Sequence, residues 1–487
     1  MIFDANVTHA VSCLKFSLSS IAISLLGGSD VDVNQTEIKQ RLDTMGVNPS
    51  KKLGQNFLID ENVARWIVAQ LEIEPGDTVV EVGPGTGALT EHVVDIADKV
   101  ILVEFDARLA EGLKKRYQDH DHVEVHHFDG ARYDTRQLYQ HQPVKLLGNL
   151  PYSAGGAIMR NFMKRPSPVC KAVLMLQKEF IDRIIAEPRT KAYGVLSLRM
   201  QSEWSSRPVK TIPPQAFFPR PLIDSTVMVC DPRPDDLPVY DARLFDELVR
   251  RGFAQRRKQV RKQMPVTKKW EDAASLIGVS ETARAEEISL EQWVELTRYY
   301  DEHPLKDTAQ DGNEIFDVVD EDDNVIRQEL RSIVHGDDLL HRAVHIFVFN
   351  KHKELFLQKR SRLKDKHPGV WDSSAAGHLN AGEGYNETAV RELEEELGIM
   401  PDDLQEVLAL SPSAETGWVH IKLYLARHDG ALRFPCSEIE TGQWFSMDDV
   451  RAWIERRPDD FASGFIECWN AFNTMLGAKA KQDPEEA

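Results

Sequence analysis

The stretch DTVVEVGPGTGALT, residues 77–90, decides the fold of the first part of this chain. It predicts a buried β-strand that runs into a glycine-rich turn and then into a helix. Gly83, Gly85 and Gly87 allow a ligand to approach the backbone closely at the start of that helix. The same pattern also occurs as a tight turn without a ligand, so other residues have to decide between the two interpretations.

Acidic residues follow at the ends of the next two expected strands. KVILVEFD (99–106) contains Glu104, seventeen residues after Gly87, where a carboxylate can hold the two hydroxyls of a ribose. A third strand ends in HHFDGA (126–131), where Asp129 can meet an adenine amine. Together these positions predict a nucleoside site at the carboxyl edge of a doubly wound α/β sheet.

The chemistry depends on KLLGNLPYSAGG, residues 145–156. Asn149 can offer its side-chain oxygen, and the stiff Leu150-Pro151 peptide a carbonyl, to the two hydrogens of a flat exocyclic amine. Tyr152 supplies a face on which the base can stack. Accepting both hydrogens turns the nitrogen lone pair toward an electrophile, so no strong base is required. The alternative is a proline turn with a buried tyrosine.

Several motifs occur in the order in which the ribosomal RNA adenine dimethyltransferases of the KsgA type carry them. They are KKLGQNFLID (51–60), EVGPGTGALT (81–90), VEFD (103–106), NLPY (149–152), MLQKEFIDRI (175–184), KAYGVLSLRMQ (191–201), AFFPRPLIDSTV (216–227), FAQRRKQVRKQM (253–264) and RAEEISLEQW (284–293). Residues 38–300 resemble this family. The sequence departs from it at Ser153–Gly156 after NLPY, which can alter how the target loop closes, and at Leu222, where lysine is common.

The resemblance implies a Rossmann-like fold, S-adenosylmethionine as cofactor and small-subunit (16S) rRNA as partner. Two adjacent adenosines near the 3′ end would each be methylated twice at N6. The residues implied to contact the cofactor are Gln55, Asn56, Leu58, Gly83, Gly85, Glu104, Asp129 and Asn149.

A basic stretch, RRGFAQRRKQVRKQM (250–264), carries seven Lys and Arg residues between positions 250 and 262. Such a ridge suits contacts with phosphates, which position RNA without reading its sequence. The RNA-binding candidates are Arg256, Arg257, Lys258, Arg261 and Lys262. A merely solvated basic face is the alternative. Because the target adenine must leave its stack, an RNA loop is a better substrate than a duplex.

The stretch GHLNAGEGYNETAVRELEEELGI (377–399) crowds glutamates onto one helix. At about 100° per residue, Glu392, Glu395 and Glu396 share one face, while leucines on another face point to a core. Like charges at this spacing repel each other, and a hard cation such as Mg²⁺ or Mn²⁺ reverses the sign of their interaction. Arg391 would orient a carboxylate by bidentate pairing.

This spacing matches the Nudix box at every defined position, and the resemblance extends over residues 314–476. It implies a Nudix α/β/α sandwich that hydrolyses a small diphosphate, with Glu392 as a catalytic residue and Gly377, Glu392, Glu395 and Glu396 at the metal. The flanking sequences resemble the isopentenyl-diphosphate isomerases and their hydrolase relatives. Ala376 replaces the isomerases' catalytic cysteine, which favours hydrolysis.

Other Nudix positions stay open. Glu415, Glu438 and Glu440 are unranked candidates for a further metal carboxylate, and Gln443 occupies a place where some Nudix enzymes have Glu. His345, His378 and His420 are interpreted as structural, because carboxylates suffice for a hard cation.

The charge is divided between the two parts. Residues 38–303 hold 38 Lys and Arg against 38 Asp and Glu, whereas residues 304–487 hold 20 against 36. We therefore expect two self-sufficient pockets with different partners. The predicted organisation is a disordered extension over 1–37, a methyltransferase domain over 38–239, a helical RNA-facing domain over 240–303, a linker over 304–313, the Nudix domain over 314–480 and a tail over 481–487.

Alternatives remain for both parts. For the first part the alternatives are an RNA-binding or assembly-checking module with weak catalysis, and a DNA or protein-glutamine amine methyltransferase. The segments LGQNFL and QRRKQVRKQ favour rRNA. The second has a catalytically silent phosphate-binding module as its rival. Five scattered cysteines without CxxC spacing predict a reducing compartment, the cytoplasm, and the absence of a long apolar run predicts no membrane partner. Asp4 and Lys15 disfavour a signal peptide.

Overall fold

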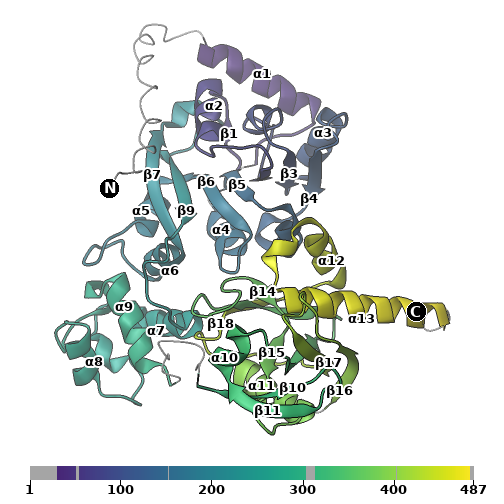
Figure 1. The fold of residues 1–487 in the computed structure, drawn as a ribbon. Coiled ribbons are helices and arrows are strands. Elements are labelled where there is room, and N and C mark those ends of the chain that lie inside the picture. Colours follow the sequence, from purple (N-terminus) through teal and green to yellow (C-terminus); the bar gives the residue numbers. More distant parts are fainter. Residues whose placement is uncertain (1–29, 51–53, 152, 303–312, 402, 483–487) are drawn as a thin grey trace, which may run out of the picture.

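The computed structural model describes residues 30–50, 54–151, 153–302, 313–401 and 403–482 (Figure 1). Tyr152 lies outside these residues. Helix α1 (Asp30–Thr44) begins inside the expected N-terminal extension, and its residues Ile38 and Leu42 are buried against the first domain. None of the described helices is both long and apolar enough to cross a membrane.

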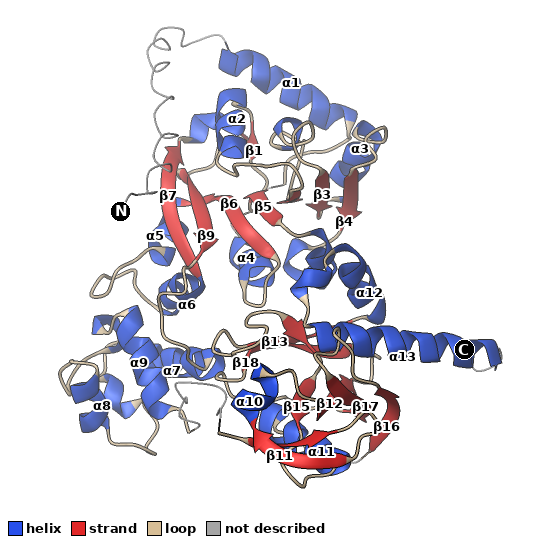
Figure 2. Cartoon of the chain, viewed as in Figure 1, coloured by secondary structure: helices blue, strands red, loops and turns tan. Residues whose placement is uncertain are grey.

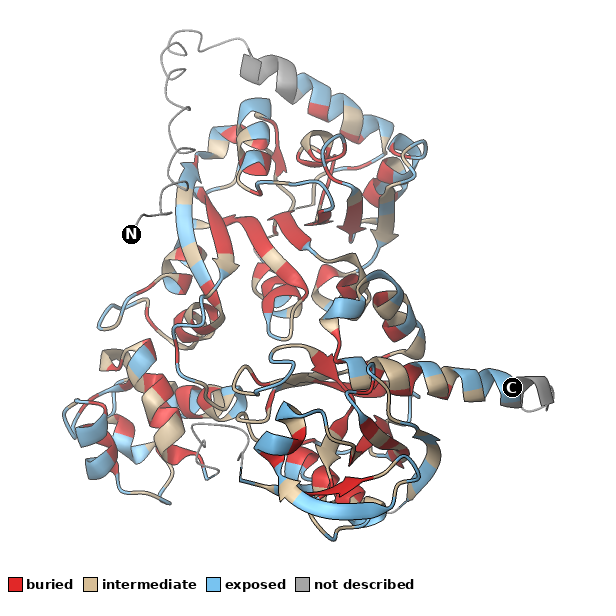
Figure 3. Ribbon diagram, in the orientation of Figure 1, coloured by how far each residue is buried: buried red, intermediate tan, exposed pale blue. Residues whose placement is uncertain are grey.

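The first domain is built on a seven-stranded sheet with the strand order β4-β3-β2-β5-β6-β9-β7. The first five strands in this order, β4, β3, β2, β5 and β6, run parallel to one another. Strand β9 runs antiparallel to both of its neighbours. The strands are β2 (Thr78–Val82), β3 (Lys99–Glu104), β4 (Val123–His127), β5 (Val144–Asn149), β6 (Val169–Gln177), β7 (Trp204–Ile212) and β9 (Ser225–Pro232). All residues of β2 are buried, because both faces of this strand are covered. Strand β6 of the same sheet is likewise buried over most of its length (Figure 3).

Helices cover both faces of this sheet (Figure 2). On one face pack α2 (Glu61–Ala69) and α3 (Ala107–Arg116); on the other pack α4 (Gly155–Met163), α5 (Lys178–Ile184) and α6 (Val195–Glu203). Neighbouring residues of β2 serve opposite faces, since Val79 joins the cluster with α2 and Val80 joins the cluster with α4. The predicted doubly wound α/β fold is confirmed.

A connector, residues 233–241, leads from β9 to a small helical domain. This domain consists of α7 (Ala242–Ala254), α8 (Trp270–Leu276) and α9 (Leu290–Tyr300), packed around the fully buried Trp293. The Tyr193 hydroxyl donates a hydrogen bond of 2.9 Å to the Ile288 carbonyl and joins the helical domain to the sheet domain. A third apolar cluster covers both partners, so the two domains pack directly on each other.

The domain after residue 313 has a second seven-stranded sheet between helices, the expected α/β/α sandwich. Helix α11 (Tyr385–Leu397) packs on one face, and α12 (Met447–Arg456) and α13 (Ser463–Gln482) pack on the other. The strands are β12 (His341–Phe349), β13 (Leu355–Arg360), β14 (Trp371–Asp372), β15 (Ala375–His378), β16 (Leu404–Leu410), β17 (Val419–Arg427) and β18 (Ile439–Phe445). A hairpin of β10 (Ile315–Val319) and β11 (Val325–Leu330) leads into α10 (Arg331–Gly336).

This second sandwich packs against the first sheet at the edge where the parallel strands begin, called here the amino edge. The 3₁₀ segment η4 (Thr135–His141) leads into that edge just before β5, and its Tyr139 is only 3% exposed. The Tyr139 ring lies 4.6–5.6 Å from the ring centroids of Trp371, Phe445 and Trp453. Arg457 donates a hydrogen bond of 3.0 Å to the Gln142 carbonyl beside it. The two sandwiches therefore share one aromatic core at this edge.

Candidate active sites

The glycine turn after β2 has the conformation that a close ligand approach requires. Gly83, Gly85 and Gly87 have φ angles of 70°, 59° and 81°, in the left-handed region that favours glycine. A Cβ at Gly85 would lie 3.1 Å from the Phe57 ring, so this position is also tight. The Gly85 amide donates a hydrogen bond of 2.9 Å to Oε2 of Glu104. The turn and the expected ribose carboxylate are therefore in direct contact.

Two buried carboxyls lie beneath this turn. Glu104 also accepts a hydrogen bond of 2.8 Å from the Asp106 amide, and burial raises its pKa. Glu81 is 1% exposed and accepts a hydrogen bond of 2.6 Å from the Thr90 hydroxyl. Burial raises the pKa of Glu81 to about 8. Of these two carboxyls the sequence points to Glu104 alone, because Glu81 lies inside the strand and carries no strand-end signal.

The other expected cofactor residues converge on the same carboxyl edge. The Asn149 side-chain amide, at the end of β5, donates a hydrogen bond of 3.1 Å to the Asn56 carbonyl. Asp129 caps the short 3₁₀ helix after β4 through the Ala131 amide at 2.9 Å. Gln55 accepts from the Ser50 amide at 2.8 Å, and Leu58 is buried in β1 (Phe57–Leu58).

The NLPY loop is held by backbone hydrogen bonds. The Leu150 amide donates to the Met175 carbonyl at 3.1 Å, and the Pro151 carbonyl accepts from the Ala154 and Gly155 amides at 3.0 and 2.9 Å. Because the Asn149 amide nitrogen donates to Asn56, its Oδ1 is oriented as the acceptor of the pair. An amide oxygen in this orientation is an acceptor of the kind expected for an exocyclic amine.

Two exposed aromatic rings were missed by sequence reasoning. Phe105 is 57% exposed directly after Glu104, and Phe128 is 48% exposed directly before Asp129. Exposed phenyl rings beside a nucleoside site offer faces on which a base can stack. An apolar residue next to each strand-end carboxylate was the available signal.

The basic ridge divides into an internal and an external part. Arg256 donates to Glu286 at 2.6 Å and to the Thr190 carbonyl at 2.9 Å, so it joins the helical domain to the sheet domain. Arg257, Lys258, Arg261 and Lys262 are exposed. A hollow of about 560 Å³ is lined by Arg257, Lys258, Gln259, Lys262, Thr282 and Arg284. Four cations around one hollow suit a phosphate backbone.

The second domain gathers buried carboxyls on α11. Glu392 is 8% and Glu396 is 5% exposed, and Glu396 Oε2 accepts hydrogen bonds of 3.1 Å from Gln358 and from the Ala376 amide. A Cβ at Gly377 would lie 2.0 Å from Oε1 of Glu392, so this position must lack a side chain. Burial raises the pKa of both carboxyls, and the negative charges around them add to that shift.

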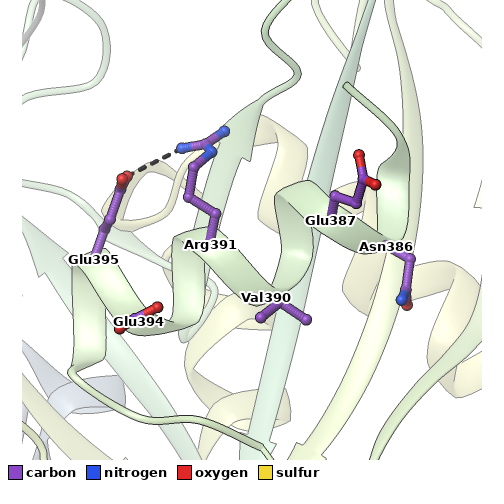
Figure 4. A pocket seen from close by; sticks show the side chains of 6 residues that line it. All are labelled: Asn386, Glu387, Val390, Arg391, Glu394 and Glu395. Carbon is purple, nitrogen blue, oxygen red and sulfur yellow. Dashed lines mark hydrogen bonds and ion pairs between the residues drawn. The ribbon is translucent and has the colours of Figure 1, made fainter. Parts of the chain in front are cut away.

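Arg391 orients the acidic groups, as the sequence predicts. Its Nε and Nη2 pair with the two carboxylate oxygens of Glu383 at 2.9 and 3.1 Å, and its Nη1 lies 2.8 Å from Glu392. Nη1 also reaches Glu395 at 3.0 Å, whose side chain is 61% exposed (Figure 4). Glu395 therefore lies at the outer rim, in a hollow of about 870 Å³ that Glu394 also lines. The structure does not bring it into the buried pair.

Among the further carboxylates, Glu438 lies nearest to the buried pair. The negative charge of Glu438 contributes to the raised pKa of Glu396. The Glu438 carboxylate also forms an ion pair with Lys364, whose side chain is only 7% exposed. Glu440 pairs instead with Lys359 at 3.8 Å, and Glu415 is exposed. Lys364 was missed by sequence reasoning, since a lysine in the loop SRLKDKHPG carries no spacing signal. Its ammonium lies in the ion pair with Glu438 and acts electrostatically on Glu396.

Three histidines form a separate cluster beside this site. The ligand atoms of His335, His341 and His378 all lie within 4.8 Å of one another. Nε2 of His335 and of His341 are buried without a hydrogen-bond partner among the described residues. Burial lowers the pKa of His335 to about 3 and that of His341 to about 4. Both rings are therefore neutral near pH 7, the form in which an imidazole nitrogen binds a metal ion.

The other histidines have ordinary partners. His345 contacts the Ser373 hydroxyl at 2.7 Å, and His420 contacts the Asp320 carbonyl at 3.0 Å. Those contacts fit the structural interpretation of His345 and His420. For His378 the cluster offers a second interpretation, because three imidazoles whose ligand atoms lie within 4.8 Å of one another suit a transition metal.

Known proteins resemble the two parts separately. A family model described as ribosomal RNA adenine dimethylase matches residues 46–302, and a NUDIX domain model matches residues 339–463. The ribosomal RNA small subunit methyltransferase A of Francisella tularensis is 35% identical over 252 residues, which are 51% of this chain and 96% of that protein.

Solved structures match each part as well. A dimethyladenosine transferase from Plasmodium falciparum is 23% identical over 49% of this chain and 95% of its own, with a TM-score of 0.42. DR0079 from Deinococcus radiodurans is 30% identical over 29% of this chain and 89% of its own, with a TM-score of 0.27. The assignment rests on the sequence matches, the first of which covers more than half of the chain. The chain thus belongs to the ribosomal RNA adenine dimethylase family and carries a NUDIX domain as a second enzyme unit.

Proposed function

We propose that the first part dimethylates N6 of two adjacent adenosines near the 3′ end of small-subunit rRNA, with S-adenosylmethionine as methyl donor. The observation that carries this proposal is the meeting of Asn149, Glu104 and the glycine turn at one sheet edge. A nucleoside cofactor fits this edge, because Glu104 offers ribose acceptors and Phe105 and Phe128 offer faces to a base. A ribosomal substrate would place the protein in the cytoplasm.

The protein's contribution is positioning. The bound cofactor supplies a methyl group on a sulfonium. Oδ1 of Asn149 and the Leu150 carbonyl accept the two amine hydrogens, which directs the nitrogen lone pair outward. Exposed cations at Arg257, Lys258 and Lys262 hold RNA phosphates.

Transfer of labelled methyl groups to unmethylated small-subunit particles tests this function. We expect Asn149→Ala to lower the rate by at least about 100-fold, because one acceptor of the amine is lost. Asn473→Ala is the matched control, since that side-chain amide donates to the Trp469 carbonyl within α13, outside the methyltransferase part. An inert wild type would favour the alternative of an RNA-binding or assembly-checking module. Faster methylation of DNA or protein in competition would favour the amine methyltransferase alternative.

We further propose that the NUDIX domain hydrolyses a small diphosphate with Mg²⁺ or Mn²⁺. The observation that carries it is the buried pair Glu392 and Glu396, which would repel each other without a cation. The donors fit such an ion, since carboxylate oxygens are the ligands of hard divalent cations. Glu392, Glu396 and Glu438 would hold it, with Glu395 at the rim. The ion supplies an acidified water and neutralises phosphate charge.

The residues of the chain prepare the substrate. Arg391 holds Glu392 in place, and Lys364 meets the diphosphate that enters beside Glu438. A panel of nucleotide and isoprenoid diphosphates, assayed for released phosphate or monophosphate, tests this activity. We expect Glu396→Gln to abolish turnover while the fold is kept, because the isosteric amide fills the same space. No turnover of any panel member with either cation would favour the silent phosphate-binding module.

A further inference from the structure

Two loops of the NUDIX domain serve the carboxylate site and also touch the methyltransferase part. The first rim loop, residues 361–366, carries Lys364, and the second rim loop, residues 430–438, ends at Glu438. These two side chains pair with each other, and both act electrostatically on Glu396. The Ser361 amide donates to the Glu438 carbonyl at 2.9 Å, so the loops are also joined through their backbones.

The first rim loop is fastened to the connector. Arg362, two residues before Lys364, donates a hydrogen bond to the Leu237 carbonyl and forms an ion pair with Asp235. Leu237 is itself buried in the core of the helical domain. Arg362 thus reaches a backbone atom that belongs to the methyltransferase body.

The second rim loop is fastened to α7, which lies next to the NUDIX domain in Figure 1. Arg243 donates to the Leu432 carbonyl, and its guanidinium lies 4.4 Å from the centroid of the Phe434 ring. A cation over an aromatic face adds attraction to the hydrogen bond. Three residues separate Phe434 from Glu438, so this contact is close to the site in sequence.

Both contact points are held by further interactions within the methyltransferase part. Arg233 pairs with Asp236 at 2.8 Å and donates to the Gln201 carbonyl at 2.9 Å, which holds the connector against α6. Asp241 caps α7 by accepting from the Arg243 amide at 2.7 Å. The positions of the two rim loops therefore depend on contacts with the neighbouring domain.

We propose that Arg243 and Arg362 are positioning residues of the NUDIX site, through which the methyltransferase body holds Lys364 and Glu438 in their working places. The hydrolase pocket is then completed by the other domain and is not self-sufficient, in contrast to the expectation from the sequence. This inference rests on the proposed diphosphate hydrolysis for its activity readout. Its binding readout is independent of turnover.

The experiment compares full-length wild type, Arg243→Ala/Arg362→Ala and the control Arg451→Ala. Arg451 lies in α12 and pairs with Asp448 at 2.6 Å, away from both rim loops. We measure Mn²⁺ binding by electron paramagnetic resonance and kcat and KM on the diphosphate panel. In the double variant we expect Mn²⁺ binding about 5-fold weaker and kcat/KM about 10-fold lower, mainly through KM, because loop groups have moved from their working geometry.

Two further observations separate positioning from misfolding. Arg243→Lys/Arg362→Lys keeps both charges and should recover part of the loss, and S-adenosylmethionine binding should equal that of wild type in every variant. Wild-type Mn²⁺ affinity and kcat/KM in the double alanine variant would overturn the proposal. If wild type turns over no diphosphate, the hydrolase proposal fails; weaker Mn²⁺ binding in the double variant would then still support positioning, and equal binding would end it.

Discussion

A single missing side chain makes room for the buried Glu392 of the NUDIX domain. A Cβ at Gly377 would come within 2.0 Å of Oε1 of Glu392, closer than any real contact. We expect Gly377→Ala to displace Glu392 and to lower kcat/KM for diphosphate hydrolysis by about 100-fold. Phosphate release measures this. Gly384→Ala is the control, since its added Cβ meets nothing nearer than 3.7 Å, and equal activity of the two variants would contradict the prediction.

Glu81 makes the stability of the unliganded protein depend on pH. Its pKa is about 8 in the folded state against an ordinary value of 4.5, so its stabilising contribution is complete below pH 4.5 and is lost as pH rises toward 8. The loss has a slope of about 1.4 kcal/mol per pH unit. Glu81→Gln should remove most of this slope between pH 6 and 8, in urea unfolding at several pH values.

The control for this experiment is Glu111→Gln, which changes an exposed carboxyl on α3. It should keep the slope of wild type. A Glu81→Gln variant whose unfolding free energy falls with pH as steeply as that of wild type would refute the assignment.

Residues at the ends of regular elements were the predictable ones. Glu104 and Asn149 end their strands and Asp129 comes two residues after one, and parallel strands bring their carboxyl ends to one edge. Glu81 and Lys364 were not predictable, because the first is hidden in an apolar run and the second lies in an irregular loop. Their importance arises from burial and from neighbours distant in sequence.

Among the elements, α11 shows how far helical periodicity reaches. The predicted register correctly separates the buried Glu392 and Glu396 from the exposed Glu394. It also placed Glu395 with the buried pair, whereas the structure shows this side chain turned outward to Arg391, four residues earlier. Helical periodicity determines the direction of the Cα–Cβ bond. The end of a long side chain is placed by its interaction partner, which for Glu395 is Arg391.

We predict a transition-metal site where helix α10 meets strands β12 and β15. They bring His335, His341 and His378 together as neutral imidazoles, ligands that suit Zn²⁺ and its neighbours better than Mg²⁺. We expect the purified protein to retain about one zinc-type ion per chain after dialysis, and His378→Ala to lose it. Elemental analysis measures the content.

The matched control is His420→Ala, whose ring contacts the Asp320 carbonyl outside the cluster. That variant should keep its metal. Equal metal content in the two alanine variants, or none in wild type, would show that the three histidines pack without an ion.

For the whole molecule, Tyr139 couples the stability of the two sandwiches. Its ring is 3% exposed and lies among Trp371, Phe445 and Trp453 of the other domain. We expect Tyr139→Ala to cost about 3–5 kcal/mol at this contact, as other buried aromatic truncations do. Tryptophan fluorescence during urea unfolding should then show the NUDIX domain melting earlier than the methyltransferase domain.

Tyr139→Phe is the matched control, because the Tyr139 hydroxyl is buried without a partner among the described residues. Removing it should leave stability unchanged or slightly increased. Identical unfolding midpoints for Tyr139→Ala and wild type would show that the aromatic contact contributes nothing to coupling.

This coupling could not be predicted from the sequence. Both folds follow from local motifs, but Tyr139 lies in the polar segment TRQLYQH, where one aromatic residue has no periodic partner. The rim-loop contacts of Arg243 and Arg362 are equally hidden, since each joins residues more than 120 positions apart. Docking of two domains depends on surface shape, which motif order does not encode.

The attachment of the NUDIX domain at the amino edge affects how the two substrates reach the protein. Both Gln142 and the connector lie at the end of the sheet opposite to Asn149 and Glu104. With the proposed functions, a ribosomal particle would bind at the carboxyl edge of the first sheet, and the diphosphate would reach the NUDIX domain attached at the opposite edge. The enzyme needs no alternation between its two tasks, and saturating one should leave the turnover of the other unhindered by crowding.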